Sequence, residues 1–182
     1  FELKQVIDFI KSTDPSTKLT TQRGDKLNYI PTRSVKLTLD KAELVSKGLV
    51  PLDKMNEVPN ELVWNIGGSA IYKNDLMLLD LLATNNWERP IYFANPSSVK
   101  KVFGLDEYMH LEGFVYRLLP YKADGLIKGM GGVNADKAYS LLVEKAKWGN
   151  LNSKDVTIDR ESHRNSGIPK NNFLRVAEVL IE

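Results

Sequence analysis

The stretch Asn74–Asn95, NDLMLLDLLATNNWERPIYFAN, decides the expected fold. Residues 76–83 are apolar except for Asp80, so the helix that they predict has no clean polar face. Asn74 or Asp75 is expected to cap its first turn. A helix of this composition is expected to be fully buried at the centre of the core.

The second half of this stretch predicts a turn and then a strand. Residues 84–86 are short polar side chains that compete for backbone hydrogen bonds, and Pro90 disfavours a helical Arg89. The unbroken apolar run at residues 91–94 is typical of an interior strand that is covered on both faces. With a further strand predicted at residues 62–66, the pattern is a β-α-β crossover between parallel strands.

The expected class is therefore α/β, with a small mixed sheet of about four strands, the β-α-β crossover and flanking helices. Apolar spacing in residues 1–10 predicts an amphipathic helix, and alternation in residues 35–39 predicts a half-covered strand. Other expected elements are a helical turn at 41–46, a short helix at 97–103, another turn at 105–111, a strand at 114–119, a glycine-rich loop at 125–133, a long helix capped by Asn134 and an edge strand at 156–158. Residues 159–172 are expected to be polar and mobile. A final amphipathic helix follows, with an apolar stripe of Phe173, Val176, Ala177, Leu180 and Ile181.

Composition limits the classes of protein to which the chain can belong. Its 182 residues, 42% of them hydrophobic, predict an α/β domain over residues 1–160 and a linker with a helix over 161–182. The 25 basic residues nearly balance the 23 acidic ones, which argues against nucleic acid as a partner. No cysteine is present, so disulfides and thiolate catalysis are excluded. A start at Phe1 and an apolar periodic end are expected of a fragment of a longer protein.

Asp106, Glu107 and His110 form the densest cluster of ionisable residues. In a helix, Asp106 and His110 would lie one turn apart, a spacing that suits acid-base chemistry or metal binding. No HExxH or comparable ligand pattern accompanies them, so a capping or surface role is the favoured interpretation and no metal is expected. Residues 128–132 likewise match neither phosphate-loop pattern.

Trp87 and Arg89 are the other candidates for a binding role. Of the three tryptophans, Trp87 is the best placed to stack on a sugar, although burial in a core is the commoner use of tryptophan. Arg89 can pair with Glu88, with Asp80 or with an external carboxylate, and the internal pair is the default expectation. The binding residues expected, if the chain binds a ligand, are thus Trp87, Arg89, Asp106 and His110.

Four segments carry a resemblance to a known family: LMLLDLLATNNWERPIYFA (76–94), GLDEYMHLEGFVYRLLP (104–120), GGVNADKAYSLLVEKAKWGN (131–150) and KNNFLRVAEVLIE (170–182). In this order and spacing they resemble the C-terminal part of a family of bacterial polytopic membrane proteins. That family, long labelled a domain of unknown function, is related to protein O-mannosyltransferases of the GT-C type.

The resemblance implies a multi-spanning region before this segment, an extracytoplasmic position and tetratricopeptide-like helical repeats after it. It implies that the full-length protein is a glycosyltransferase whose acidic catalytic residue lies outside this chain. The leading hypothesis is a non-catalytic accessory domain on the periplasmic side of the inner membrane, without a cofactor, that positions an acceptor or the repeats. Its expected partners are its own transmembrane region, the repeats and a protein or glycan acceptor.

Two alternatives belong to other classes. One is a hydrolase that acts on sugar or peptide and uses Asp106, Glu107 and His110, and the other is a structural spacer without a ligand.

Overall fold

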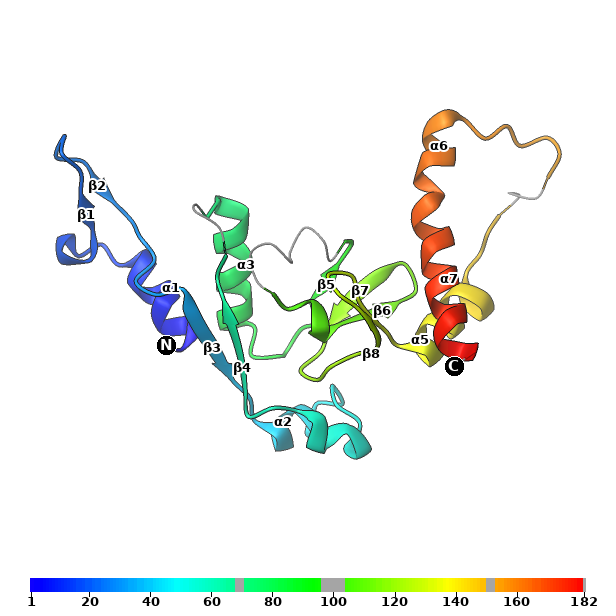
Figure 1. Ribbon diagram of the computed structural model, residues 1–182, viewed down its shortest axis with the longest axis horizontal. Helices are drawn as coiled ribbons and strands as arrows, with labels where there is room; N and C mark the ends of the chain where they lie inside the picture. Colours follow the sequence, from blue (N-terminus) through cyan, green and yellow to red (C-terminus); the bar gives the residue numbers. More distant parts are fainter. Residues whose placement is uncertain (68–70, 96–103, 150–152, 182) are drawn as a thin grey trace. The chain divides into compact units, whose positions relative to one another are not determined.

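The computed structural model describes residues 1–67, 71–95, 104–149 and 153–181, which form two compact units (Figure 1). Unit 1 contains Phe1–Pro90 together with Gly104 and Leu105. Unit 2 contains Ile91–Asn95 and the described residues from Asp106 onward. The chain thus mixes helices with small sheets, and the predicted α/β class is confirmed. The short helix predicted at 97–103 lies outside the described residues.

Unit 1 is built from helices and two separate two-stranded antiparallel sheets. Its elements are α1 (Leu3–Lys11), η1 (Pro15–Thr17), β1 (Leu19–Thr20), β2 (Lys26–Leu27), β3 (Ser34–Thr38), α2 (Lys41–Ser46), η2 (Leu52–Glu57), β4 (Glu61–Asn65) and α3 (Lys73–Thr84). β3 pairs with β4 from Ser34↔Asn65 to Thr38↔Glu61, and α1 packs against both β3 and α3. The predicted helix at the start of the chain and the strands near residues 35 and 62 are confirmed.

The core of unit 1 is aliphatic. α1 buries one face, on which Leu3, Val6 and Ile7 are at most 3% exposed. The β3–β4 sheet also buries Val35 and Leu62, each at most 2% exposed, and α3 buries Leu79 completely. Residues of β4 alternate between exposed and buried because one face of a two-stranded sheet is left for solvent.

The prediction that α3 is fully enclosed is wrong. Leu79 and Leu82 are buried, but Met77 is 73% exposed and Leu81 is 46% exposed, so the helix has one buried face and one open face. Of the two residues predicted to cap its first turn, Asp75 does so. The Asp75 carboxylate accepts a hydrogen bond from the Tyr72 backbone N–H at 3.0 Å, reaching back from the third position of the helix.

The predicted β-α-β crossover is also wrong. β4 pairs antiparallel with β3 in unit 1, whereas the strand after α3, β5 (Tyr92–Phe93), pairs antiparallel with β7 in unit 2. β5 lies at the edge of its sheet, and Tyr92 is 47% exposed. An apolar run followed by proline therefore marked a short edge strand, not an interior one.

Unit 2 contains a five-stranded mixed sheet in the order β5-β7-β6-β9-β8. Its elements after β5 are η3 (Asp106–Tyr108), β6 (Met109–Glu112), β7 (Val115–Leu118), β8 (Asp124–Ile127), β9 (Gly131–Val133), α5 (Ala135–Tyr139), the π-helical turn η4 (Ser140–Lys145), α6 (Arg160–Asn165) and α7 (Gly167–Ile181). β6 pairs antiparallel with β7 and parallel with β9. The predicted strand at 114–119 and the Asn134 cap, which accepts from the Lys137 N–H at 3.2 Å, are confirmed.

Three predictions for this unit are wrong. The glycine-rich segment 125–133 is not a loop but contains most of β8 and all of its neighbour β9. Gly131 has φ +73°, and a Cβ there would lie 2.6 Å from the Met109 carbonyl oxygen, so glycine permits close pairing with β6. Residues 156–158 form no strand, and the polar stretch from Asp159 begins α6, which Asp159 caps by accepting from the Ser162 N–H at 2.8 Å.

α7 is attached to the sheet of unit 2 through polar side chains. Arg175 is 5% exposed, and its guanidinium donates to the Tyr116 hydroxyl at 2.6 Å and to the carbonyls of Met130 at 3.1 Å and Gly131 at 2.7 Å. Asn172 donates to the Gly113 carbonyl at 3.0 Å. Of the predicted apolar stripe, Val176 is buried, but Leu180 is 52% exposed and Ile181 85%.

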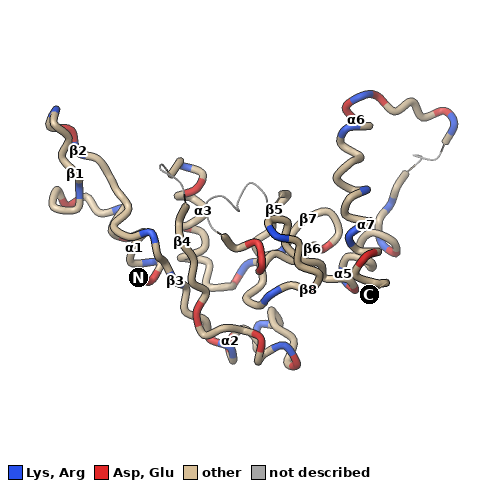
Figure 2. Tube along the Cα trace, viewed as in Figure 1, with Lys and Arg blue, Asp and Glu red and all other residues tan. Residues whose placement is uncertain are grey.

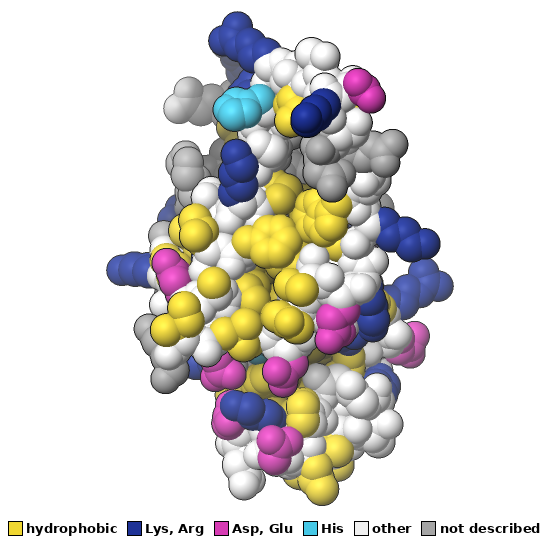
Figure 3. Space-filling view, turned by 90° about the vertical axis from the view of Figure 1, so that its right-hand side faces the viewer, with side chains coloured by type: hydrophobic (Ala, Val, Ile, Leu, Met, Phe, Trp, Pro, Cys, Tyr) yellow, Lys and Arg dark blue, Asp and Glu magenta, His cyan; other side chains and the backbone are white. Residues whose placement is uncertain are grey.

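An apolar patch lies on the surface of unit 2. Rings of Phe114, Trp148 and Phe173 contact in sequence, with centroid distances of 5.7 Å and 5.6 Å. Phe114 and Trp148 are 41% and 40% exposed, and the space-filling view shows hydrophobic side chains gathered on this side of the molecule (Figure 3). Basic and acidic residues, by contrast, are interspersed along both units (Figure 2).

Candidate functional site

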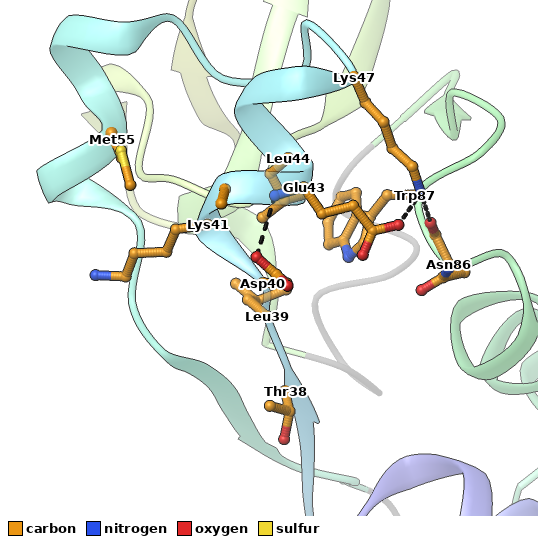
Figure 4. Close-up of a pocket in the computed structure, with 11 residues that line it drawn as sticks. Thr38, Leu39, Asp40, Lys41, Glu43, Leu44, Lys47, Met55, Asn86 and Trp87 are labelled. Carbon is orange, nitrogen blue, oxygen red and sulfur yellow. Dashed lines mark hydrogen bonds and ion pairs between the residues drawn. The ribbon is translucent and has the colours of Figure 1, made fainter.

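A pocket in unit 1 brings Trp87 to the side of α2 (Figure 4). Its volume is about 590 Å³, within the range of roughly 300–1,000 Å³ that is usual for small-molecule sites. The lining residues come from the end of β3, from α2, from η2 and from the turn after α3: Thr38, Leu39, Asp40, Lys41, Ala42, Glu43, Leu44, Lys47, Met55, Asn86 and Trp87. The pocket thus combines one aromatic wall with aliphatic and charged side chains.

The turn that carries Trp87 has an unusual backbone. The Glu88 N–H donates to the Asn85 carbonyl at 2.9 Å, and the two residues between them, Asn86 and Trp87, have φ values of 43° and 57°. Positive φ at both central positions is the geometry of a type I′ turn, which favours Asn at the first position and Gly at the second. Tryptophan therefore occupies a position where glycine would carry no strain, and such strain costs on the order of 1–3 kcal/mol.

Side-chain hydrogen bonds hold this turn against α2. The Lys47 ammonium donates to the Asn86 carbonyl at 2.8 Å and pairs with the Glu43 carboxylate at 2.7 Å. At the start of α2, the Asp40 carboxylate accepts from the Glu43 N–H at 3.1 Å. The close-up shows these contacts linking α2 to the turn around the indole (Figure 4). They fix the direction of the Trp87 side chain, which is half-buried.

Arg89 lies close to this turn but does not line the pocket. Its backbone carbonyl accepts from the Asn85 side-chain amide at 2.7 Å, and its side chain is exposed. Of the two internal acids named as its partners, Asp80 pairs with Lys11 at 2.7 Å. A binding role for Trp87 or Arg89 stays a prediction.

Asp106 and His110 are not placed on one helix, so the predicted one-turn spacing is wrong. Asp106 belongs to the 3₁₀ turn η3, whereas His110 lies in strand β6, because the segment pairs with β7 and β9. Strand pairing prevailed over the local helical pattern. Both residues belong to unit 2, whereas the residues that line the Trp87 pocket belong to unit 1.

Each ionisable residue of this cluster contacts a different structural partner. The Asp106 carboxylate accepts from the Gly129 N–H at 2.7 Å, and Glu107 pairs with Lys122 at 2.6 Å. That partner raises the pKa of Lys122 above its usual value through a hydrogen bond and Coulomb attraction. His110 is 3% exposed, lies 2.9 Å through Nε2 from the Tyr121 carbonyl oxygen, and packs edge-on against the Tyr121 ring. Among the described residues, no group of His, Asp and Glu has metal-binding geometry.

Sequence reasoning found Trp87 but missed the residues that surround it. Asp40, Glu43 and Lys47 look like an ordinary solvated helix start, and they approach Trp87 only because the chain returns after α3. The sequence did contain a signal for the turn itself, since the polar run Asn85-Asn86 is typical of a tight turn. It contained none for the residues of α2 that approach this turn.

The fold and the pocket define a chain of the mixed α/β class with an aromatic pocket in unit 1. A protein-family model, TMEM260-associated domain 2, matches residues 1–137. Because this match spans more than half of the 182 residues, the chain belongs to the TMEM260-associated domain 2 family. The chain is therefore a domain that is associated with a family of membrane proteins. No curated protein and no solved structure matches the chain.

None of the described helices is both long enough and apolar enough to cross a membrane.

Proposed function

We propose that this chain is a non-catalytic accessory domain of a membrane glycosyltransferase-like protein, and that it faces the periplasm and positions an acceptor. Membership of a family associated with membrane proteins supports the first part. The resemblance of residues 76–182 to the GT-C-related family supports the link with glycosyl transfer. The observation that carries the positioning role is the Trp87 pocket, since its aromatic wall is held in a strained turn by contacts from α2.

The contrast between this pocket and the Asp106 cluster favours binding over catalysis. A general acid or base must reach its substrate, yet His110 is 3% exposed and packed against Tyr121. The pocket, by contrast, is open and lined by the end of β3, α2 and the turn. A domain that binds one part of an acceptor can raise its local concentration at a catalytic centre elsewhere.

The test is sugar transfer by the membrane protein that carries this domain. Trp87→Ala should raise KM for the acceptor about tenfold, equivalent to roughly 1.4 kcal/mol of lost binding, with kcat nearly unchanged. Leu52→Ala is the matched control, because Leu52 is 75% exposed on η2 and does not line the pocket. Unchanged kinetics in a folded Trp87→Ala protein would contradict the positioning role.

A second arm separates the accessory role from hydrolysis by the domain itself. His110→Gln should leave transfer nearly intact wherever the thermal midpoint shows that the variant folds. A loss of 100-fold or more, the size expected when a general acid or base is removed, would instead favour the hydrolase.

The exposed end of α7 supports a further part of this proposal, the docking of helical repeats. Leu180 and Ile181 continue the apolar stripe beyond the buried Val176. A chain extended through two following helices should therefore have a higher thermal midpoint than the 182-residue chain. Equal midpoints would leave α7 without a docking role.

A further inference from the structure

We propose that the Trp87 pocket binds a neutral sugar residue stacked on the indole, and that it does not bind the phosphate of a glycosyl donor. This inference rests on the proposed accessory function and names the part of the acceptor that the pocket would hold. It is carried by the charge balance of the lining, by the pairing of Lys47 with Glu43 and the Asn86 carbonyl, and by the direction of the indole.

The formal charges of the pocket cancel. Two acids, Asp40 and Glu43, and two bases, Lys41 and Lys47, line it. The Lys47 ammonium already donates to the Glu43 carboxylate and the Asn86 carbonyl, at 2.7 Å and 2.8 Å. The Lys41 side chain extends away from Trp87 (Figure 4). A phosphate group stacked near Trp87 would therefore meet two carboxylates and an ammonium whose charge is balanced by Glu43 and which has one of its three N–H donors left. Strong phosphate sites instead use charged donors that are free to form several hydrogen bonds.

The same balance argues against a cationic ligand. A quaternary ammonium or a lysine side chain gains from an aromatic face when the site carries excess negative charge or several rings. Here each acid has an internal partner, since the Asp40 carboxylate caps α2 and Glu43 pairs with Lys47. The lining thus suits a ligand without net charge.

The remaining chemistry of the lining is amphipathic. Leu39, Leu44 and Met55 are apolar, while the Thr38 hydroxyl, the Asn86 amide and the two carboxylates provide polar groups at the same cavity. A sugar ring has this same division, with C–H groups on its faces and hydroxyls around its edge. The indole can stack on the face of the ring, while carboxylate oxygens accept from its hydroxyls.

The backbone explains why the indole is available for stacking. With Asn86 and Trp87 both at positive φ, the turn reverses the chain within two residues and directs the indole into the pocket beside α2. Backbone outliers of this kind concentrate at ligand sites, where surrounding contacts maintain them. The Lys47 hydrogen bond to the Asn86 carbonyl is such a contact.

The experiment follows the indole N–H signals of the three tryptophans by NMR in the 182-residue chain. The probes are methyl α-mannoside, methyl β-glucoside and methyl β-N-acetylglucosaminide, each with its corresponding sugar 1-phosphate. At least one neutral glycoside should shift the Trp87 signal, identified by its absence in Trp87→Phe, and should leave the Trp64 and Trp148 signals in place. Its 1-phosphate should bind no more tightly. The absence of a Trp87 shift with all three glycosides, or a shift with 1-phosphates only, would overturn the inference.

Three variants test the inference: two remove the indole and one changes the charge of the lining. Trp87→Ala should weaken glycoside binding at least tenfold. Trp87→Gly should weaken it equally, and because glycine adopts positive φ without strain, this variant should keep the turn folded. Glu43→Gln frees the Lys47 ammonium, so binding of a sugar 1-phosphate should rise several-fold at low salt and fall as salt is added. Unchanged phosphate binding in a folded Glu43→Gln chain would contradict the role assigned to charge balance.

The outcomes also separate this inference from the proposed function. If no glycoside binds at Trp87 while Trp87→Ala still raises KM for the acceptor, the accessory role stands and the acceptor is contacted through a part other than sugar. If a glycoside binds at Trp87 while transfer is unaffected by Trp87→Ala, the sugar site stands and the accessory role fails.

Discussion

The two units keep their shape by different means. Unit 1 buries aliphatic side chains from α1, β3, β4 and α3, and Asp75 is its one buried ionisable side chain within the described part. Unit 2 buries His110, Glu112, Asn172 and Arg175 beside its own apolar core. An apolar core is specified by volume and pattern, whereas buried polar groups demand particular partners. Unit 1 should therefore be sensitive to lost volume and unit 2 to lost hydrogen bonds.

The largest expected effect is a cavity in unit 1. Leu79→Ala should lower the free energy of unfolding by roughly 2–5 kcal/mol, because Leu79 is fully buried between α3 and its neighbours. Met77→Ala on the same helix should cost no more than about 0.5 kcal/mol, since Met77 is 73% exposed. Denaturant midpoints measure both. Equal losses of stability in the two variants would contradict the assignment of α3 to the core of unit 1.

A smaller effect is expected from the buried guanidinium of unit 2. Arg175→Met should cost about 2–3 kcal/mol, because the Tyr116 hydroxyl and the carbonyls of Met130 and Gly131 lose a donor. Relief from burying a charge offsets part of that loss. Arg164→Met is the control, as the Arg164 side chain is 81% exposed. If Arg175→Met is neutral, buried polar contacts do not hold α7 in place.

The Trp87 turn offers a test of backbone strain within unit 1. Trp87→Gly and Trp87→Ala remove the same indole contacts, but alanine keeps the strain of positive φ. The glycine variant should therefore be more stable than the alanine variant by about 1 kcal/mol. Thermal unfolding of the two proteins gives the difference directly. An alanine variant at least as stable would show that the turn relaxes once the indole is gone.

The smallest expected effect is the pH dependence of two aspartate caps, one in each unit. Hydrogen bonds from Ser16 and Ser162 hold the pKa of Asp14 and Asp159, respectively, below the usual value. A lowered folded pKa means that each cap contributes fully above the unfolded pKa of about 3.9 and is lost as pH falls through the folded value. NMR titration of the Ser16 and Ser162 amides should show both transitions below that pH, and Asp159→Asn should abolish one of them. A transition above the ordinary pKa would contradict the caps.

The same contrast explains which features the sequence could predict. α1, β3 and β4 follow from apolar spacing, because volume and periodicity are local properties of the chain. The pairing of β5 with β7 does not follow from local pattern, because an apolar run such as Ile91–Ala94 is compatible with an edge strand as well as with an interior strand. β9 contains Gly131 because of a close approach to Met109. No local pattern reports such an approach.

The candidate site was predictable to a similar degree. Trp87 could be singled out from its residue type and the polar turn before it. The hydrogen bond from Lys47 to the Asn86 carbonyl could not, because these residues lie 39 positions apart in the chain. The burial of Arg175 on an otherwise amphipathic helix was equally invisible, since arginine is usually a surface residue.

The hydrogen bonds of α7 have a consequence for where this domain ends. The family match stops at residue 137, yet Arg175 and Asn172 donate to acceptors at 113, 116, 130 and 131, inside the matched region. A polypeptide shortened to the match would keep every strand of the sheet and lose the 15-residue helix that satisfies these acceptors. α7 thus supplies the hydrogen-bond donors that these acceptors in the sheet region use. A synthetic peptide with the α7 sequence should therefore bind the shortened polypeptide and raise its thermal midpoint.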